Sequence, residues 1–145
     1  MSSVVFIGHN ECYGLSIKAL NEVIKQCIEN GTTTFLSGGQ GRFDRVCATA
    51  VFKLKKEYPH IKNVLIIPYL SFNVFNREIF DEIVFPNGFE KYHFKAAILQ
   101  RNRYMVNQSE VAICFIEHGW GNAIKTYEFA KKKNLKTINL SRYDG

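Results

Sequence analysis

Short apolar runs alternate with helix-like patterns along this chain, and that alternation is the feature that most limits its fold. The runs are rich in β-branched and aromatic residues and show little polar alternation, which is typical of strands buried on both faces. The expected strands are Ser3–Ile7, Thr33–Leu36, Asn63–Ile67, Ile83–Phe85, Val111–Ile116 and Lys136–Leu140.

Between these runs, apolar residues recur at helical spacing. Strands that alternate with helices and are apolar throughout pair in parallel, and the helices then cover both faces of the sheet. The sequence therefore predicts an α/β fold with a doubly wound, mainly parallel, Rossmann-like sheet. The expected helices cover about Leu20–Ile28, Cys47–Tyr58, Lys95–Asn107 and Asn122–Lys133.

The length of 145 residues fits one domain with a single fold, so we expect residues 1–145 to form it alone. No apolar run is long enough to span a membrane, and the N-terminal MSSVVFIGHN indicates a strand and not a signal peptide. The four cysteines lack metal-site spacing and the histidines lack an HxxxH pattern. We predict reduced, buried thiols, a cytoplasmic location, no metal and no cofactor.

The net charge of +6 suits an anionic partner, whether a nucleotide, a nucleic acid or an acidic surface. Part of this charge sits in lysine clusters at the ends of predicted helices, where it offsets the helix dipole. No segment interleaves basic and aromatic residues as single-strand binders do. A small nucleotide is therefore the expected partner, and nucleic acid is not.

Ligands of doubly wound sheets bind outside the carboxyl ends of the strands, near the point where strand order reverses. The segment SGGQGRFD follows the second expected strand and opens a helix. Glycines there permit close backbone approach, and free amides at a helix start can hold phosphate. The alternative is a tight turn with a capping aspartate. The predicted ligand residues in this turn are Ser37, Gly38, Gly39, Gly41 and Asp44.

A second turn of the same kind, HGWGNAIK, follows the strongest apolar run. Trp120, the only tryptophan, either stacks on a base or covers the edge of the core. The loop after the first strand, GHNECYG, ends at the same edge of the sheet. These two segments add Gly8, His9, Asn10, Gly119, Trp120, Gly121, Asn122 and Lys125 to the predicted ligand residues.

The segment QRNRYMVNQSE places Arg101 and Arg103 on the helix before the fifth major strand. Arginine suits planar recognition of phosphate, and Arg101 is the predicted counter-charge of the ligand. The alternative is a solvated helix face.

Several of these motifs together resemble the SLOG superfamily, which includes the Lonely Guy phosphoribohydrolases and the DNA-processing protein DprA. The similarity is strongest to small single-domain members of the YspA/YoqJ type. It covers nearly the whole chain. The motifs that carry it are SGG with Asp44, the helix end LKKEYP, RNRYMVNQSE, and the glycine turn with KTYEFAKKKNLKTINL. The resemblance implies a nucleotide or nucleotide-derivative site at the two glycine turns, with ADP-ribose-type signals as one ligand class.

The Lonely Guy enzymes carry an arginine shortly before a methionine, and Arg101 before Met105 matches it. Their glycine motif is not matched: His118 stands where its first glycine would fall, and Lys125 stands in the place of the catalytic glutamate. Glu128 follows one turn later.

We therefore expect a sensor or sequestering protein for a nucleotide-derived ligand, assembled as a homo-oligomer. Two alternatives stay open at this point. One is an N-glycosidic hydrolase of nucleoside monophosphates with Glu128 or Glu11 as its acid or nucleophile. The other is single-stranded DNA binding in the manner of DprA.

Overall fold

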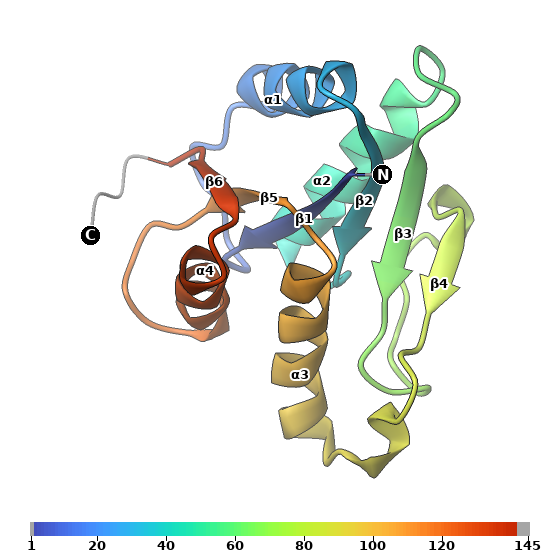
Figure 1. The fold of residues 1–145 in the computed structure, drawn as a ribbon, viewed down its shortest axis with the longest axis vertical. Coiled ribbons are helices and arrows are strands. Elements are labelled where there is room, and N and C mark those ends of the chain that lie inside the picture. Colours follow the sequence, from blue (N-terminus) through green and yellow to red (C-terminus); the bar gives the residue numbers. More distant parts are fainter. Residues whose placement is uncertain (1, 142–145) are drawn as a thin grey trace.

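Six parallel strands form one sheet in the computed structural model, which describes residues 2–141 (Figure 1). The order across the sheet is β4-β3-β2-β1-β5-β6, and every pairing is parallel. Each expected strand is present, and the doubly wound fold is confirmed. The strands are β1 (Ser2–Gly8), β2 (Thr32–Ser37), β3 (Lys62–Ile66), β4 (Glu82–Val84), β5 (Val111–Phe115) and β6 (Lys136–Asn139).

Helices cover both faces of the sheet because successive strand residues point to opposite sides. Val4 and Phe6 of β1 belong to one apolar cluster, which α1 and α2 complete, whereas Val5 and Ile7 belong to the other, with α3 and α4. The four helices are α1 (Ile17–Glu29), α2 (Arg42–Leu54), α3 (Phe94–Asn107) and α4 (Asn122–Lys132).

Two helices differ from their expected bounds. α1 begins at Ile17 and not at Leu20, and α2 is shifted toward the N-terminus. α2 begins at Arg42 and ends at Leu54, and the segment up to Tyr58 forms turns closed by bonds from Glu57 and Tyr58 amides to the Leu54 carbonyl. Proline after Tyr58 disfavours helical geometry at the preceding residue, so the helix stops early. Two short 3₁₀ helices, η1 (Arg77–Ile79) and η2 (Phe89–Lys91), lie in the long connection from β3 to α3 and were not expected.

The strand order places the topological switch beside β1. The chain moves from β1 through α1 to β2 on one side, and later returns through α3 to β5 on the other side. The carboxyl ends of β1 and β5 are therefore neighbours from which the connections diverge, and such a crevice is where ligands of these sheets bind.

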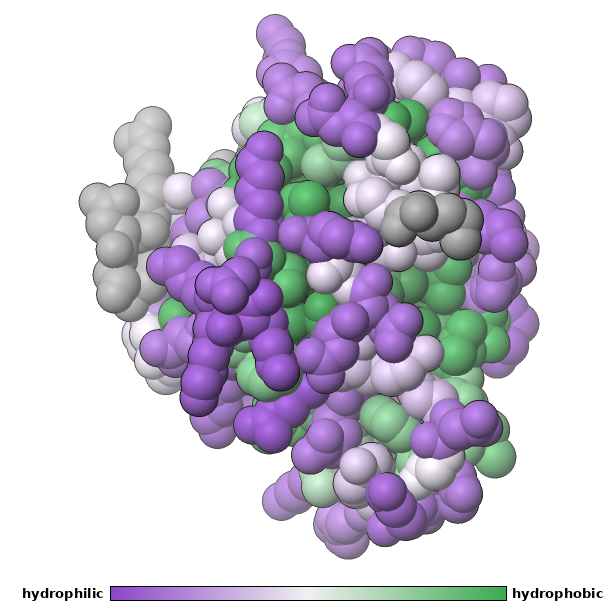
Figure 2. All heavy atoms as spheres, in the orientation of Figure 1, coloured by the Kyte–Doolittle hydropathy of each residue, from purple (hydrophilic) through white to green (hydrophobic). Residues whose placement is uncertain are grey.

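The surface drawn in Figure 2 is largely hydrophilic and the cysteines are buried, as the composition of the chain indicates. Hydrophilic side chains cover much of the face drawn in Figure 2, with apolar surface between them. All four cysteines are buried and free, as expected. Within the described part of the chain, no helix has the length and apolar character needed to cross a bilayer.

Arg101 joins three elements at the centre of the fold. Its side chain is 2% exposed, which overturns the alternative of a solvated helix face. Nη1 donates to the carbonyls of Gly38 (2.8 Å) and Ile66 (3.0 Å), Nη2 donates to Gln40 Oε1 (2.8 Å), and Nε donates to Asn102 Oδ1 (2.8 Å). A guanidinium has five N–H groups, so at most one remains for a ligand. Arg101 thus fastens α3 to the turn after β2 and to the end of β3.

We expect Arg101→Met to lower the free energy of unfolding by about 3–5 kcal/mol, because it leaves buried carbonyls unpaired and removes a buried charge from its partners. Urea unfolding followed by circular dichroism measures this change. Arg103→Met is the matched control, since Arg103 lies on the same helix but is exposed. Equal stability of the two variants would contradict a structural role for Arg101.

Candidate functional site

A cleft of about 610 Å³ opens at the carboxyl ends of β1 and β5. Its walls come from the loop after β1, the loop between β5 and α4, the turn before α2, and the inner side of α3. The cleft therefore lies at the switch point of the sheet, where the fold class predicts a ligand.

The structure brings part of the predicted site into this cleft. The predicted residues that line it are Gly8, His9, Asn10, Glu11, Asp44, Arg101, Trp120, Gly121 and Asn122. Other predicted residues are not part of its lining: Ser37, Gly38, Gly39, Gly41, Gly119, Lys125 and Glu128. The site residues are thus drawn mainly from the loops after β1 and β5, and less from the first glycine turn.

The first glycine turn is closed by contacts within the protein. A Cβ on Gly38 would lie 2.8 Å from Cζ of Arg101, so the glycine is needed for this approach. The Gln40 amide donates to Asp44 Oδ2 (3.0 Å), and the Arg42 amide donates to the Asn10 carbonyl (2.9 Å). Two amides of the turn before α2, those of Gln40 and Arg42, are therefore already paired within the protein.

The second glycine turn has the same backbone geometry but is open. Gly121 precedes α4 with φ 94° and ψ 178°, close to the φ 89° and ψ 170° of Gly41 before α2. No described side chain caps α4, and its first turn holds no acidic residue. Gly121, Asn122 and Ala123 all line the cleft, so unpaired first-turn amides and the positive end of the helix dipole lie at its wall.

Three aromatic rings form a stack beside this turn. The His9 and His118 ring centroids are 3.7 Å apart, and those of His118 and Trp120 are 3.5 Å apart, with interplanar angles of 18° and 16°. His9 is buried, and burial together with the neighbouring His118 lowers the pKa of its imidazole. Among residues 2–141, His9 Nε2 and His118 Nδ1 are buried nitrogens without a hydrogen-bond partner. Such nitrogens are rare unless a ligand or water pairs with them.

The charges that line the cleft are mostly negative. Glu11 and Glu117 are exposed, and Asp44 is buried, whereas Arg101 is the one lysine or arginine in the lining that is described. Burial raises the pKa of the Asp44 carboxyl to about 6, although the Gln40 amide and Arg101 oppose that rise. Burial also lowers the pKa of Arg101 to about 10, against the opposing charge of Asp44.

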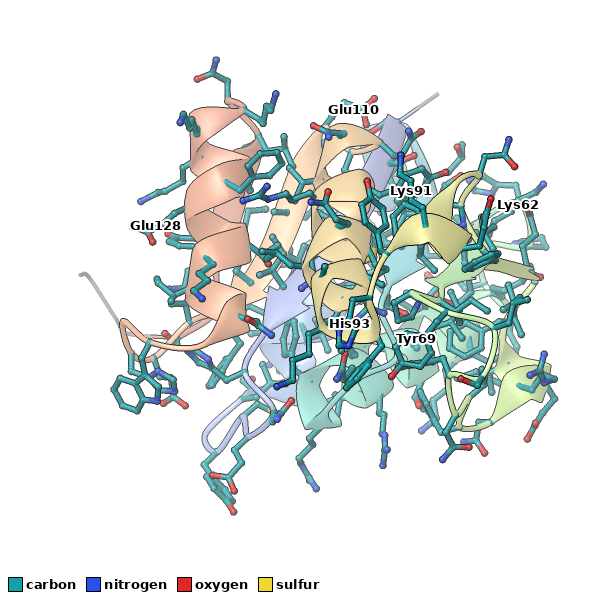
Figure 3. All side chains as sticks on the ribbon, turned by 90° about the horizontal axis from the view of Figure 1, so that it is seen from below. Lys62, Tyr69, Lys91, His93, Glu110 and Glu128 are labelled. Atoms are coloured by element: carbon teal, nitrogen blue, oxygen red, sulfur yellow. The ribbon has the colours of Figure 1, made fainter. Side chains whose placement is uncertain are left out.

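Two residues of the hydrolase alternative lie away from the cleft. Glu128 is exposed on α4 and points away from α3 in Figure 3. Lys125 is also exposed and is absent from the lining that the structure describes. Glu11 does line the cleft, so it is the carboxylate of that alternative that can reach a bound ligand.

Seven further residues with polar or aromatic side chains line the cleft but were not predicted as ligand residues: Phe6, Tyr13, Gln40, Asn102, Glu117, His118 and Thr126. Each lies within or directly beside a segment that sequence reasoning had selected. The sequence predicts which loops follow the carboxyl ends of the strands. It does not show which side chains within those loops face a ligand.

The pKa of Asp44 predicts how stability changes with pH. In the folded state this pKa is about 6, above its ordinary value of 3.8, so folding favours the protonated form. The contribution of Asp44 to the free energy of unfolding is therefore largest below about pH 4 and falls by up to about 3 kcal/mol as pH rises through 6. Asp44→Asn lacks this titration. We expect the stability of wild type minus that of the variant to fall between pH 4 and 7 in urea unfolding; a rise would mean that Arg101 stabilises the carboxylate.

Comparison with known proteins identifies a matching family and related sequences. The family model of the YspA SLOG family matches residues 4–143. The SPbeta prophage-derived protein YoqJ of Bacillus subtilis is 27% identical over 121 residues, which are 70% of this chain and 71% of YoqJ. The UPF0398 protein BH1768 of Halalkalibacterium halodurans is 28% identical over 127 residues, with 80% of this chain and 67% of that protein covered.

Solved structures share the fold. DNA processing protein A of Helicobacter pylori superposes with a TM-score of 0.68 at 17% identity, over 99% of this chain and 67% of the other. DprA of Streptococcus pneumoniae gives the same TM-score and identity over 94% of this chain, which corresponds to only 49% of that protein. At this identity the likeness shows the fold alone. The match of the family model over nearly the whole chain shows that this protein belongs to the YspA SLOG family.

Proposed function

We propose that the protein binds a phosphorylated nucleoside, or an ADP-ribose-type derivative of one, in the cleft between β1 and β5. The observation that carries this proposal is the uncapped start of α4 at the wall of that cleft, with Gly121 at its N-cap. First-turn amides and the helix dipole favour a phosphate at this position. Membership of the SLOG family supports the same ligand class.

The charges around the cleft limit the ligand further. With Glu11, Asp44 and Glu117 in the lining, several phosphates would meet repulsion, whereas ribose hydroxyls find acceptors. A ligand with few phosphates and an exposed sugar suits this lining better than a polyphosphate. The role as a sensor or sequestering protein, the cytoplasmic location and the homo-oligomer stay predictions.

Hydrolysis of the N-glycosidic bond needs a carboxylate near the anomeric carbon. Glu128 lies outside the cleft lining, and a displacement of even about 1 Å can cost on the order of 100-fold in rate. Binding without cleavage is therefore the favoured function, and Glu11 is the residue on which the hydrolase alternative depends.

We expect AMP or ADP-ribose to raise the unfolding temperature, because a ligand at about 100 times its Kd stabilises the folded state by about 2.7 kcal/mol. Asn122→Asp adds a carboxylate to the first turn of α4, which suits the helix but repels a phosphate. This variant should fold at least as stably as wild type and bind the nucleotide about 10-fold more weakly or worse. Thermal shift and calorimetric titration measure the two effects.

Lys132→Gln is the matched control, because it changes the net charge by the same amount at the opposite end of α4. It should bind like wild type. The proposal fails if AMP, ADP, ADP-ribose, NAD and cyclic nucleotides all leave the unfolding temperature unchanged at millimolar concentration. If chromatography recovers free base after the protein is incubated with the nucleotides, the function is hydrolysis and not binding alone.

Single-stranded DNA binding is the second candidate, and one feature of the structure favours it. A groove of about 780 Å³ between α1 and α2 is lined by Arg42, Arg45 and Lys53, without any acidic residue among its described lining. The Arg45 guanidinium lies 5.2 Å from the ring centroid of Phe75. DNA processing protein A of Helicobacter pylori has a single-stranded DNA binding mode. The groove thus joins cations to an aromatic ring that lies far from them in sequence.

We expect DNA binding at this groove to be weak and independent of sequence, because Phe75 is one ring and not a stacking platform. With three phosphate contacts, the affinity for an oligothymidylate should fall about 20-fold between 50 mM and 200 mM salt. Arg42→Gln with Arg45→Gln should weaken it further, whereas Lys131→Gln with Lys132→Gln should not. Tight binding that persists at the higher salt in fluorescence anisotropy would make DNA the principal ligand.

A further inference from the structure

Two strongly exposed aromatic side chains line the cleft, and they come from different loops. Tyr13 lies in the loop between β1 and α1 and is 75% exposed. Trp120 lies in the loop between β5 and α4 and is 69% exposed. Covering exposed aromatic rings in a concave site with a planar group lowers the free energy.

Trp120 is held in place on one of its faces. Its indole stacks on His118, which stacks on the buried His9 at the end of β1. The stack is therefore anchored in the sheet and leaves the other indole face as a platform. Burial and the neighbouring His118 lower the pKa of His9, which favours the neutral imidazole within the stack.

The polar edges of this stack also lack partners. His9 is 9% exposed, yet its Nε2 has no hydrogen bond among the residues that the structure describes, and the same holds for the buried Nδ1 of His118. Both histidines line the cleft. A purely structural stack would leave these nitrogens unsatisfied at a cost, whereas polar groups of a bound ligand can pair with them.

We propose that the cleft holds the planar base of its ligand by stacking on Trp120, with Tyr13 covering the other face of the base. This inference rests on the proposed function, since it assigns the base-binding part of the same site. The phosphate then lies at the first turn of α4, adjacent in sequence to Trp120. Stacking depends on ring area more than on hydrogen-bond pattern, so purine nucleotides bind more tightly than pyrimidine nucleotides.

The single tryptophan makes this arrangement directly measurable. AMP and ADP-ribose should change the intrinsic fluorescence of Trp120, whereas ribose 5-phosphate, which has no base, should leave it nearly constant. Trp120→Ala and Tyr13→Ala should each weaken AMP binding by about 10-fold or more in calorimetry. Their affinity for ribose 5-phosphate should equal that of wild type. Trp120→Phe, which keeps a smaller ring, should recover part of the loss.

Phe52→Ala is the control for loss of an exposed aromatic ring, because Phe52 is 43% exposed on α2 and is not part of the described lining of the cleft. It should bind AMP like wild type. If AMP binds but Trp120→Ala and Tyr13→Ala bind it equally well, stacking is wrong while the proposed function stands. If neither AMP, ADP-ribose nor ribose 5-phosphate binds to the wild-type protein, the proposed function itself fails, and the base-binding role fails with it.

Discussion

The buried guanidinium of Arg101 is the interaction on which the shape of the cleft depends. A buried charge is costly unless its hydrogen bonds are satisfied. Here a carbonyl of the turn after β2, a carbonyl at the end of β3 and the side chain of Gln40 accept these hydrogen bonds. The backbone amide of the same Gln40 donates to the Asp44 carboxylate. Two residues later, the Arg42 amide donates to the Asn10 carbonyl in the loop after β1. The hydrogen bonds that Arg101 makes therefore fix the position of one wall of the cleft.

Two glycine turns with the same N-cap geometry differ in the contacts that they make. In the turn before α2, the Gln40 and Arg42 amides donate to Asp44 and Asn10, and the Gly38 carbonyl accepts from Arg101, so this turn stabilises the fold. The turn before α4 has no such partners among the described residues, and it faces the cleft. A glycine at the N-cap lacks the side-chain hydrogen bond that a serine or aspartate would make to the first turn. The amides that it leaves unpaired are available to a bound anion.

The fold could be predicted because its signal is local: apolar runs and helical periodicity mark each element, and connection rules limit how parallel strands are arranged. The site could be predicted only to the level of loops, because the carboxyl ends of strands are known once the strands are. The burial of Arg101 could not be predicted, since its partners Gly38 and Ile66 lie far away in sequence. The stacking of His9 on His118 joins two of these loops, and the sequence of neither loop alone predicts it.

Net charge illustrates the same limit. A total of +6 suggests an anionic ligand anywhere on the surface, but the fold separates the charges. Carboxylates gather at the cleft, while Arg42, Arg45 and Lys53 line a groove on the other side of α2. The net charge of the whole chain therefore does not indicate the charge of either surface alone. Arg42 contacts both surfaces, because its amide donates to the Asn10 carbonyl in a loop of the cleft and its side chain lines the groove.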